Sequence, residues 1–577
     1  MLCRVEAKSG TIPHKRFLSM KTKTSGLIFV FLYLSVFAGS LVAQTGRPNL
    51  VVDNTEAEKW RQDLRYMAEE MPKYHKNLFH AVTRDQFAVA VGRLNEKIPS
   101  LARHQIIVEL ARIVAMVSDG HTNIAPTRDP KIGFRIFPVK FYFFADGLYV
   151  RAATREHADI VGTRVRRIGN VSTEQAYRSV RDIIGRDNEM DAKFFAPFLL
   201  AMPEVLHALG IINDMEACTF EVDKEGQTKA VTLHPFGPAQ MMPPDTDLSW
   251  ASEPNWIDAR EAAQQPTPLW LKDSQNKFWF EYLTGSRTVY VQFNQVGNKD
   301  DETVEEFSRR LLAFVDSNPV SRLVLDLRLN RGGNGDFARP ILRSIIKADK
   351  IDQKGKLFTI VGRSTWSAAQ FLVNDLEKYT NTILVGEPTG GKPNSFGDSH
   401  KITLPNSGIT VRVSTLWWQQ DERDKRQWTA PELAADLTFE DYRANIDPAL
   451  KIALNYVDGK SLGVLLTEAL AANDPQLAAE RYNEWRSAPV NRYANAEEQV
   501  NRLGYELIAM KRLSQAIEAF KLNVAAYSQS ANVYDSLAEA YLLSGNRELA
   551  IKNFEKALAL EPSMSSAIEA LKKLRRE

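Results

Sequence analysis

The chain has 577 residues, too many for a single hydrophobic core, and this length predicts roughly three to four domains. With 73 basic and 71 acidic residues the formal net charge is +2, and the lack of a basic stripe argues against a nucleic-acid partner. The histidines, cysteines and acidic residues follow none of the common metal-ligand spacings, so we expect no metal and no cofactor.

Residues 1–43 have the features of an export signal. A basic segment begins at Met20, residues 27–38 are apolar at all but one position, and small residues follow as far as Ala43. This order is typical of a secretory signal peptide cleaved near Ala43, with translation starting at Met20, and it predicts a periplasmic or extracellular protein. The apolar run is short for a membrane span, and an uncleaved anchor is the alternative. Cleavage would leave Cys218 as the only cysteine, which excludes an intrachain disulfide.

Residues 47–130 are predicted to form a helical N-terminal module. Apolar side chains recur at helical spacing in two segments, first at Trp60, Leu64, Met67 and Met71 and later at Ile106, Leu110, Ile113 and Val117. The second segment runs into a polar turn at 118–122, with the sequence SDGHT.

Residues 131–236 change to short strands separated by turns. Strands and one intervening helix are expected, in chain order, at 139–143, 148–150, 173–184 (the helix), 218–222 and 230–234. This order favours a small PDZ-like module with an inserted helical stretch near 190–210. Residues 237–270 are rich in Pro, Asp and Gln and lack a period, which predicts a linker or a surface loop.

Residues 271–455 are predicted to form a core of helices and a buried sheet. A strand, a helix and a second strand occur in order, and then the arrangement repeats, at 289–293, 302–315 and 323–327 and again at 358–362, 368–376 and 383–385. Because the strands are continuous apolar runs separated by helices, a parallel or mixed sheet covered on both faces is expected.

Residues 460–577 contain an internal repeat. A small residue and an aromatic residue recur 34 positions apart, first as Ala516 and Phe520 and then as Ala550 and Phe554. This is the period of tetratricopeptide repeats, so we expect an all-α region that packs or binds a protein partner rather than performing chemistry. The whole chain is thus predicted to be an α/β multidomain protein.

Ser367 is the strongest candidate for a reactive residue. It opens a predicted helix, where backbone N–H groups can stabilise an oxyanion, but its hydroxyl needs a base to become a good nucleophile. Lys392 follows 25 residues later in a Gly-rich turn after a strand, so the chain can bring it back beside the serine. A second Gly-rich segment, 330–335, is either a plain turn or an oxyanion-binding loop, with the N–H groups of Gly333 and Ala368 as donors.

Residues 386–392 also fit the G-x-x-x-x-G-K pattern of a phosphate-binding loop. The next residue is Pro393 rather than the Ser or Thr whose hydroxyl would hold magnesium, and no helical pattern follows it. Nucleotide binding is therefore not expected.

The segments 326–335, 367–369 and 386–395 resemble the motifs of the tail-specific (C-terminal processing) serine peptidase family, in the same order and spacing. This family includes a tricorn-core-like branch, and the resemblance covers residues 55–450 or so. It implies a sheet-and-helix core, an N-terminal helical part and a PDZ-like module. It also implies cleavage of peptide bonds by a serine nucleophile at the position of Ser367.

The resemblance implies two alternative bases. In the tail-specific branch the base is a lysine, and Lys392 occupies the matching position. In the tricorn-like branch the base is a histidine, and His121 lies in a segment similar to the one that carries it. A lysine must be desolvated or placed beside a cation to lose its proton, whereas a histidine titrates near about 6.5 without adjustment. Pro393 and Lys378 depart from the lysine branch. We therefore favour Ser367 with His121, and keep Lys392 as a site neighbour or alternative base.

A histidine base would need an orienting carboxylate, and Glu422 is the candidate by its distance from Ser367 along the chain. We predict an exported serine peptidase acting on a peptide or unfolded protein substrate, which docks near the PDZ-like module by adding to a sheet edge. The alternative is a non-catalytic binding protein for peptides or small hydrophobic ligands on the same fold.

Overall fold

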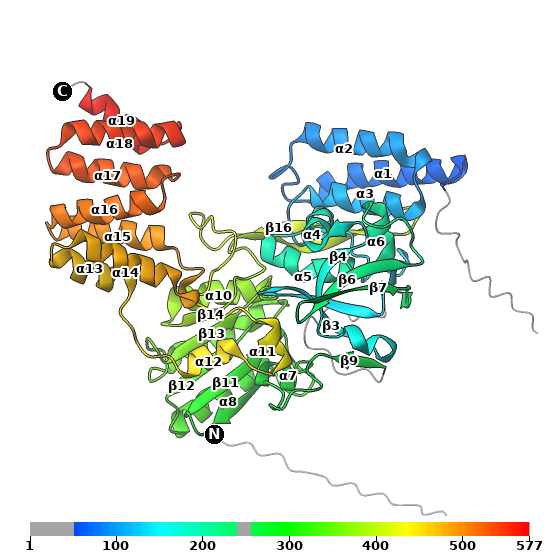
Figure 1. Cartoon of the computed structure of the whole chain (residues 1–577), viewed down its shortest axis with the longest axis horizontal. Coiled ribbons are helices and arrows are strands. Elements are labelled where there is room, and N and C mark those ends of the chain that lie inside the picture. The colour runs from blue at the N-terminus through cyan, green and yellow to red at the C-terminus, as the bar shows by residue number, and fades with distance from the viewer. Residues whose placement is uncertain (1–50, 239–254, 576–577) are drawn as a thin grey trace, which may run out of the picture. The chain divides into compact units, whose positions relative to one another are not determined.

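The structure is a computed structural model that describes residues 51–238 and 255–575 (Figure 1). The predicted signal peptide, 1–43, and the middle of the predicted linker, 239–254, lie outside the described residues. No helix within the two described ranges is both long enough and apolar enough to cross a membrane. Helices occur together with parallel and antiparallel sheets, which confirms the predicted α/β class.

Three helices form the N-terminal part of the described chain: α1 (Asn54–Tyr74), α2 (Arg84–Lys97) and α3 (Arg103–Ala115). Polar side chains fix where the first two begin. Asp53 accepts a hydrogen bond from the N–H of Glu56, and Thr83 and Gln86 form a reciprocal capping box. The apolar residues that recur along α1 and α3 are buried in one cluster. The chain leaves α3 through the turn 116–122, which contains His121.

An antiparallel sheet follows, with the strand order β2-β3-β4-β6-β7, β5 paired to β4 and β9 paired to β3. Its strands are β2 (Val139–Phe144), β3 (Gly147–Thr154), β4 (Arg164–Ile168), β5 (Val171–Ser172), β6 (Cys218–Lys224), β7 (Gln227–Leu233) and β9 (Trp256–Asp258). The connection between β5 and β6 holds the helices α4 (Thr173–Arg181), α5 (Glu189–Leu199) and α6 (Pro203–Ala208). The short strands β1 (Arg135–Ile136) and β8 (Gly237–Pro238) pair separately. That this part is PDZ-like stays a prediction, and β9 belongs to the segment predicted as a linker.

A six-stranded sheet with the order β10-β11-β12-β13-β14-β17 forms the second core. Its strands are β10 (Phe278–Leu283), β11 (Thr288–Phe293), β12 (Arg322–Asp326), β13 (Leu357–Val361), β14 (Ile383–Gly386) and β17 (Leu433–Ala434). Only β10 is antiparallel to its neighbour. Leu323 and Leu325 pack with the helices α8 (Val304–Ser317), α9 (Arg339–Lys347) and α10 (Ala368–Tyr379), whereas Val324 packs with α12 (Pro448–Leu454). Burial on both faces explains the continuous apolar strands.

The carboxyl ends of β12, β13 and β14 carry the three candidate motifs. The Gly-rich segment 327–335 follows β12, the segment 362–367 follows β13, and the Gly-rich turn 387–394 follows β14. Because these strands are parallel neighbours, the three loops lie at one edge of the sheet, where ligand sites of α/β proteins commonly form.

An aromatic cluster packs strand β2 of the antiparallel sheet against two short helices. The short helices α7 (Leu269–Lys272) and α11 (Phe439–Arg443) take part in it, and its buried residues are Tyr142, Phe144, Trp270, Phe439 and Tyr442. Arg363, in the loop after β13, also donates a hydrogen bond of 2.8 Å to the carbonyl of Phe143. The loop that leads to Ser367 is therefore tied to the antiparallel sheet.

A two-stranded antiparallel ribbon, β15 (Ser395–Thr403) and β16 (Thr410–Trp418), leaves the core after β14 and runs toward the N-terminal helices (Figure 1). Ile402, Val411 and Val413 are buried in the same apolar cluster as α1 and α3. Arg412 pairs with Asn123 through reciprocal backbone hydrogen bonds of 3.1 and 2.9 Å. The ribbon thus fastens the turn 116–122 beside the edge of the six-stranded sheet.

The C-terminal region is all-α, as predicted. Its helices are α13 (Leu462–Ala471), α14 (Pro475–Ser487), α15 (Ala496–Ala509), α16 (Leu513–Ala526), α17 (Ala531–Leu543), α18 (Arg547–Leu560) and α19 (Ser565–Leu574). Figure 1 shows them stacked in succession. A Cβ atom at Gly504 would lie 2.3 Å from the ring of Phe520, so the repeat needs its small residue opposite the aromatic one.

Candidate active site

Ser367 lies immediately before α10 in an unusual backbone conformation. Its φ is +55°, a left-handed value that is uncommon for a residue with a side chain and costs of order 1–3 kcal/mol. Several hydrogen bonds hold this turn. Thr365 Oγ1 donates to the carbonyl of Leu327 at 2.9 Å, and the N–H of Trp366 donates to the carbonyl of Asn330 at 3.1 Å. The strained conformation that these bonds hold places Ser367 at the edge of the sheet.

His121 and Ser367 are 246 positions apart in the sequence, but their side chains are neighbours in the structure. Nε2 of His121 lies 3.2 Å from Oγ of Ser367. The histidine is held by its own backbone: its N–H donates to Asp119 Oδ1 at 2.8 Å, and its carbonyl accepts from Ser399 Oγ at 2.8 Å. The N-terminal turn and the ribbon therefore both position a nitrogen within reach of the serine proton.

Asp119 anchors the turn that carries His121. Its carboxylate is buried, lies 3.0 Å from Nε2 of His75 and accepts a hydrogen bond of 2.5 Å from Thr122 Oγ1. Burial alone would raise the pKa of Asp119, but the hydrogen bonds from His75 and Thr122 and the nearby His121 outweigh burial and lower the pKa to about 2. The group is thus an anion at neutral pH, and its contact with His121 is to the backbone N–H.

The His121 ring is positioned by an aromatic stack. The imidazole and the indole of Trp366 have centroids 3.8 Å apart and planes inclined by 19°. Trp366 Nε1 donates a hydrogen bond of 2.8 Å to Asp187 Oδ2, and the Arg331 guanidinium lies 4.6 Å from an indole ring centroid. Nδ1 of His121 makes no hydrogen bond to any residue in the described ranges, although the Phe396 carbonyl is near enough to favour the protonated ring. The stack, rather than a carboxylate, fixes the ring.

The surroundings of His121 favour its neutral form. Burial lowers the pKa of His121 to about 4, Arg331 adds to the decrease, and the negative charge of Asp119 opposes it only in part. Because a neutral imidazole has a free lone pair, Nε2 can accept the Ser367 proton at neutral pH.

Two buried carboxyl groups lie behind the stack. Asp187 accepts a hydrogen bond of 3.0 Å from the N–H of Gly120, and burial together with the nearby Asp191 raises the pKa of Asp187 to about 7. Asp191 pairs with Arg331 at 3.3 Å. These contacts link the Gly-rich segment, the Trp366 indole and the turn before His121 in one polar network.

The backbone beside Ser367 offers two unused donors. A Cβ atom at Gly332 would lie 2.8 Å from Ser367 Cβ and 2.9 Å from the N atom of Ala368, so only glycine lets the two segments touch. The carbonyl of Gly332 accepts from Val296 at 2.9 Å, and Asn334 donates to the carbonyl of Val296 at 3.0 Å. In the described parts of the chain, the N–H groups of Gly333 and Ala368 make no backbone hydrogen bond. They are the two groups predicted to stabilise an oxyanion.

Lys392 lies near the site without bonding to the serine. The neighbouring N–H of Gly391 donates to the carbonyl of Thr365 at 3.1 Å, which packs this turn beside the start of α10. Among the described residues, no hydrogen bond joins Lys392 to Ser367. Burial raises the pKa of Asp187, and the positive charge of Lys392 partly offsets that increase; the same charge adds to the decrease in the pKa of His80, so the lysine is near both groups.

Glu422 is exposed, in a loop where Asp421 and Arg423 form an ion pair of 3.0 Å. It makes no hydrogen bond to the His121 ring. Its role as an orienting carboxylate stays a prediction without a contact to support it. Sequence reasoning missed Trp366 and Asp187. Trp366 could have been noticed as the neighbour of Ser367, but nothing in the sequence connects Asp187 to either motif.

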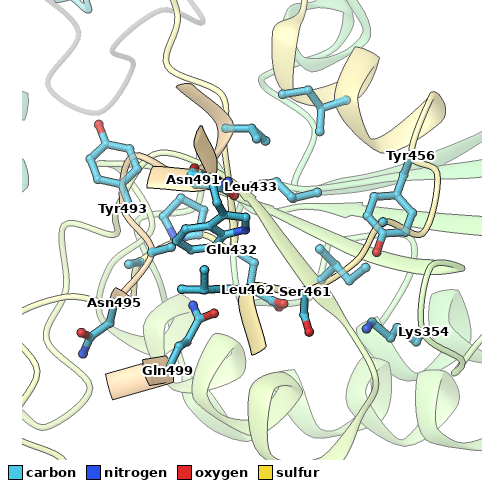
Figure 2. A pocket seen from close by; sticks show the side chains of 18 of the residues that line it. Lys354, Glu432, Leu433, Tyr456, Ser461, Leu462, Asn491, Tyr493, Asn495 and Gln499 are labelled. Atoms are coloured by element: carbon cyan, nitrogen blue, oxygen red, sulfur yellow. Dashed lines mark hydrogen bonds between the residues drawn. The ribbon is translucent and has the colours of Figure 1, made fainter. Parts of the chain in front are cut away.

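No candidate site residue lines the cavity of about 1270 Å³ shown in Figure 2. Its walls come from the end of the six-stranded core, the segment 457–462 and the beginning of the C-terminal region, and include Lys354, Glu432, Tyr456 and Tyr493. Within the described residues, no group of three or more His, Cys, Asp or Glu side chains is arranged to hold a metal ion.

A strained serine, a neutral histidine and two free amides at the edge of a parallel sheet are the kinds of group that acyl transfer requires.

Residues 531–564 match the family model of the tetratricopeptide repeat, which confirms the predicted repeat. No curated protein matches the chain. Similar solved structures include mature CPAF complexed with lactacystin (12% identity, TM-score 0.49, covering 72% of this chain and 99% of that one). They also include the photosystem II D1 C-terminal processing protease, at 12% identity and a TM-score of 0.33, covering 67% of this chain and 94% of that one. A putative S41 protease from Bacteroides fragilis matches at 14% identity and a TM-score of 0.28, covering 58% of this chain and 86% of that one.

Proposed function

We propose that the protein is an exported serine peptidase that uses Ser367 as nucleophile and His121 as base. The observation that supports this most directly is the 3.2 Å separation between His121 Nε2 and Ser367 Oγ. A hydrogen bond of this length is within reach of proton transfer to a general base. A peptide or unfolded protein is the substrate, and the tetratricopeptide region is available for a protein partner.

The proposed reaction has two halves. Ser367 Oγ attacks the carbonyl carbon of the scissile peptide bond while its proton passes to His121 Nε2, and the N–H groups of Gly333 and Ala368 stabilise the oxyanion. The tetrahedral intermediate collapses, the C–N bond breaks, and His121 returns the proton to the leaving amine. Water then attacks the acyl-serine and loses a proton to His121. The second tetrahedral intermediate collapses, the ester C–O bond breaks, His121 returns the proton to Ser367 Oγ, and the new carboxyl end departs.

Labelling with a fluorophosphonate tests this proposal independently of substrate. The reagent phosphonylates only an activated serine, so we expect a single adduct, mapped to Ser367 by mass spectrometry of the purified protein. Heat-denatured protein is the control and should remain unlabelled. If native protein stays unlabelled at several pH values, the proposal fails and a non-catalytic binding protein becomes the better interpretation.

The acid limb of the pH profile should report His121. The base works only when neutral, and burial lowers the pKa of His121 to about 4. Cleavage should therefore stay constant from neutral pH into the weakly acidic range and fall to half near pH 4, well below the ordinary histidine value of about 6.5. Initial rates of peptide cleavage, with circular dichroism at each pH to show that the protein is folded, measure this. A midpoint near the ordinary value would contradict the burial described for His121.

A further inference from the structure

The end of β16 exposes three consecutive large apolar residues, Leu416, Trp417 and Trp418, with 45, 41 and 45% of their surfaces exposed. Side chains alternate between the two faces of a strand, so Leu416 and Trp418 share one face and Trp417 occupies the other. A run of exposed apolar side chains of this size usually marks a binding surface.

Both indoles are held in place. Trp418 Nε1 donates a hydrogen bond of 2.6 Å to Asp398 Oδ2, and Trp417 Nε1 donates one of 2.9 Å to Gln419 Oε1. Asp398 has a φ of +55°, a left-handed value. Because their N–H groups already have partners, the two rings are fixed aromatic surfaces, and what they offer to a ligand is apolar area.

The face that carries Trp418 adjoins the candidate active site. Leu416 pairs with Gly397, and a Cβ atom at Gly397 would lie 3.1 Å from Trp418 Cδ1 and 3.9 Å from His121 Cε1. The Trp418 indole and the His121 imidazole therefore lie on either side of Gly397, and both are close to the position that a Cβ atom would occupy there.

Phe371 extends this apolar surface to the nucleophile. It lies one helical turn after Ser367 on α10, and its ring centroid is 6.1 Å from that of Trp418. Leu416, Trp418 and Phe371 are called the aromatic wall below. The other face of the ribbon differs, because the Trp417 ring packs 4.5 Å from Phe396, whose own ring lies 4.8 Å from His75.

We propose that the aromatic wall binds a large apolar side chain of the peptide substrate next to the scissile bond, so that the peptidase selects sequences with an aromatic or large aliphatic residue there. This inference rests on the proposed function. The wall is continuous with the Ser367–His121 pair, which makes the occupant a residue of the chain being cleaved rather than a separate ligand. Apolar burial against two rings supplies affinity without a charged partner.

Digestion of reduced, alkylated casein, with cleavage sites mapped by mass spectrometry, gives the first readout. The wild type should cleave at sites where one fixed position beside the scissile bond is enriched in aromatic or large aliphatic residues. Two synthetic peptides that differ only at that position, one with Phe and one with Ala, then give a ratio of kcat/KM values. Trp418→Ala should lower the Phe-to-Ala ratio about tenfold, the scale of losing an apolar contact in a specificity pocket.

Trp417→Ala is the matched control, because it removes the same side chain, equally exposed, from the same strand but from the other face. It should leave the Phe-to-Ala ratio within about twofold of the wild type. An unchanged ratio in Trp418→Ala, or an equal loss in both variants, would overturn the inference. Binding of the two peptides to Ser367→Ala, followed by calorimetry, repeats the comparison without turnover, and equal affinities there would also overturn it. Failure of Ser367 to react with a fluorophosphonate is a different outcome and removes the proposed function itself.

Discussion

Replacing Ser367 with alanine should reduce peptide cleavage by about a million-fold, to the background rate, because the nucleophile is lost while the rest of the site remains. The φ of +55° is no more strained for alanine than for serine, so the variant should fold. The measurement is release of product from a fluorogenic peptide, with thermal unfolding to show that the melting temperature is retained.

Ser364→Ala is the control for this experiment. Ser364 lies three residues earlier in the same turn, is 3% exposed and is not hydrogen-bonded to His121. It should keep most of the activity. Cleavage by Ser367→Ala at more than a small fraction of the wild-type rate would show that another residue carries the chemistry.

His121→Ala should nearly match the serine variant, with a loss of about ten-thousand-fold or more, because the serine then has no base within hydrogen-bond reach. Lys392→Met keeps most of the length of the side chain and removes its charge. It should change kcat less than about tenfold, since no hydrogen bond joins Lys392 to Ser367 in the described chain. Steady-state kinetics of the two variants on one peptide make the comparison.

His80→Ala controls for the loss of a histidine ring near the ribbon. Its ring lies 4.5 Å from that of Phe396 and makes no hydrogen bond to Ser367 or His121. We expect it to retain activity. If Lys392→Met were as inactive as Ser367→Ala while His121→Ala still cleaved, the base would be the lysine, and the tail-specific alternative would replace the histidine one.

Much of the fold follows from local patterns in the sequence. The apolar runs 323–327 and 383–385 are continuous because the central strands are buried on both faces, and together with the helices between them they predict a parallel or mixed sheet. The 34-residue period predicts the all-α repeat, and within one repeat Gly504 packs against Phe520. The motifs predict an oxyanion-binding loop at 330–335 beside Ser367, and in the structure these segments lie at one sheet edge because they follow the neighbouring parallel strands β12 and β13.

The remaining site residues depend on tertiary contacts that no local pattern encodes. His121 reaches Ser367 through long-range contacts of the turn that carries it, among them those with Arg412 and Ser399 of the ribbon. Glu422 as the orienting carboxylate of the histidine stays a prediction. The structure stacks the His121 ring on Trp366, whose hydrogen-bond partner Asp187 is distant along the chain from the three motifs.

The ribbon β15–β16 has a mechanical consequence. The segments that carry the reacting hydroxyl and its proton acceptor flank separate apolar clusters, and the seam between them is held by the ribbon and by polar contacts such as Asp187 with Trp366 and Asp191 with Arg331. Local opening of this seam requires less free energy than global unfolding. On warming, peptide cleavage should therefore be lost while both sheets are still folded, and cooling should restore the cleavage rate.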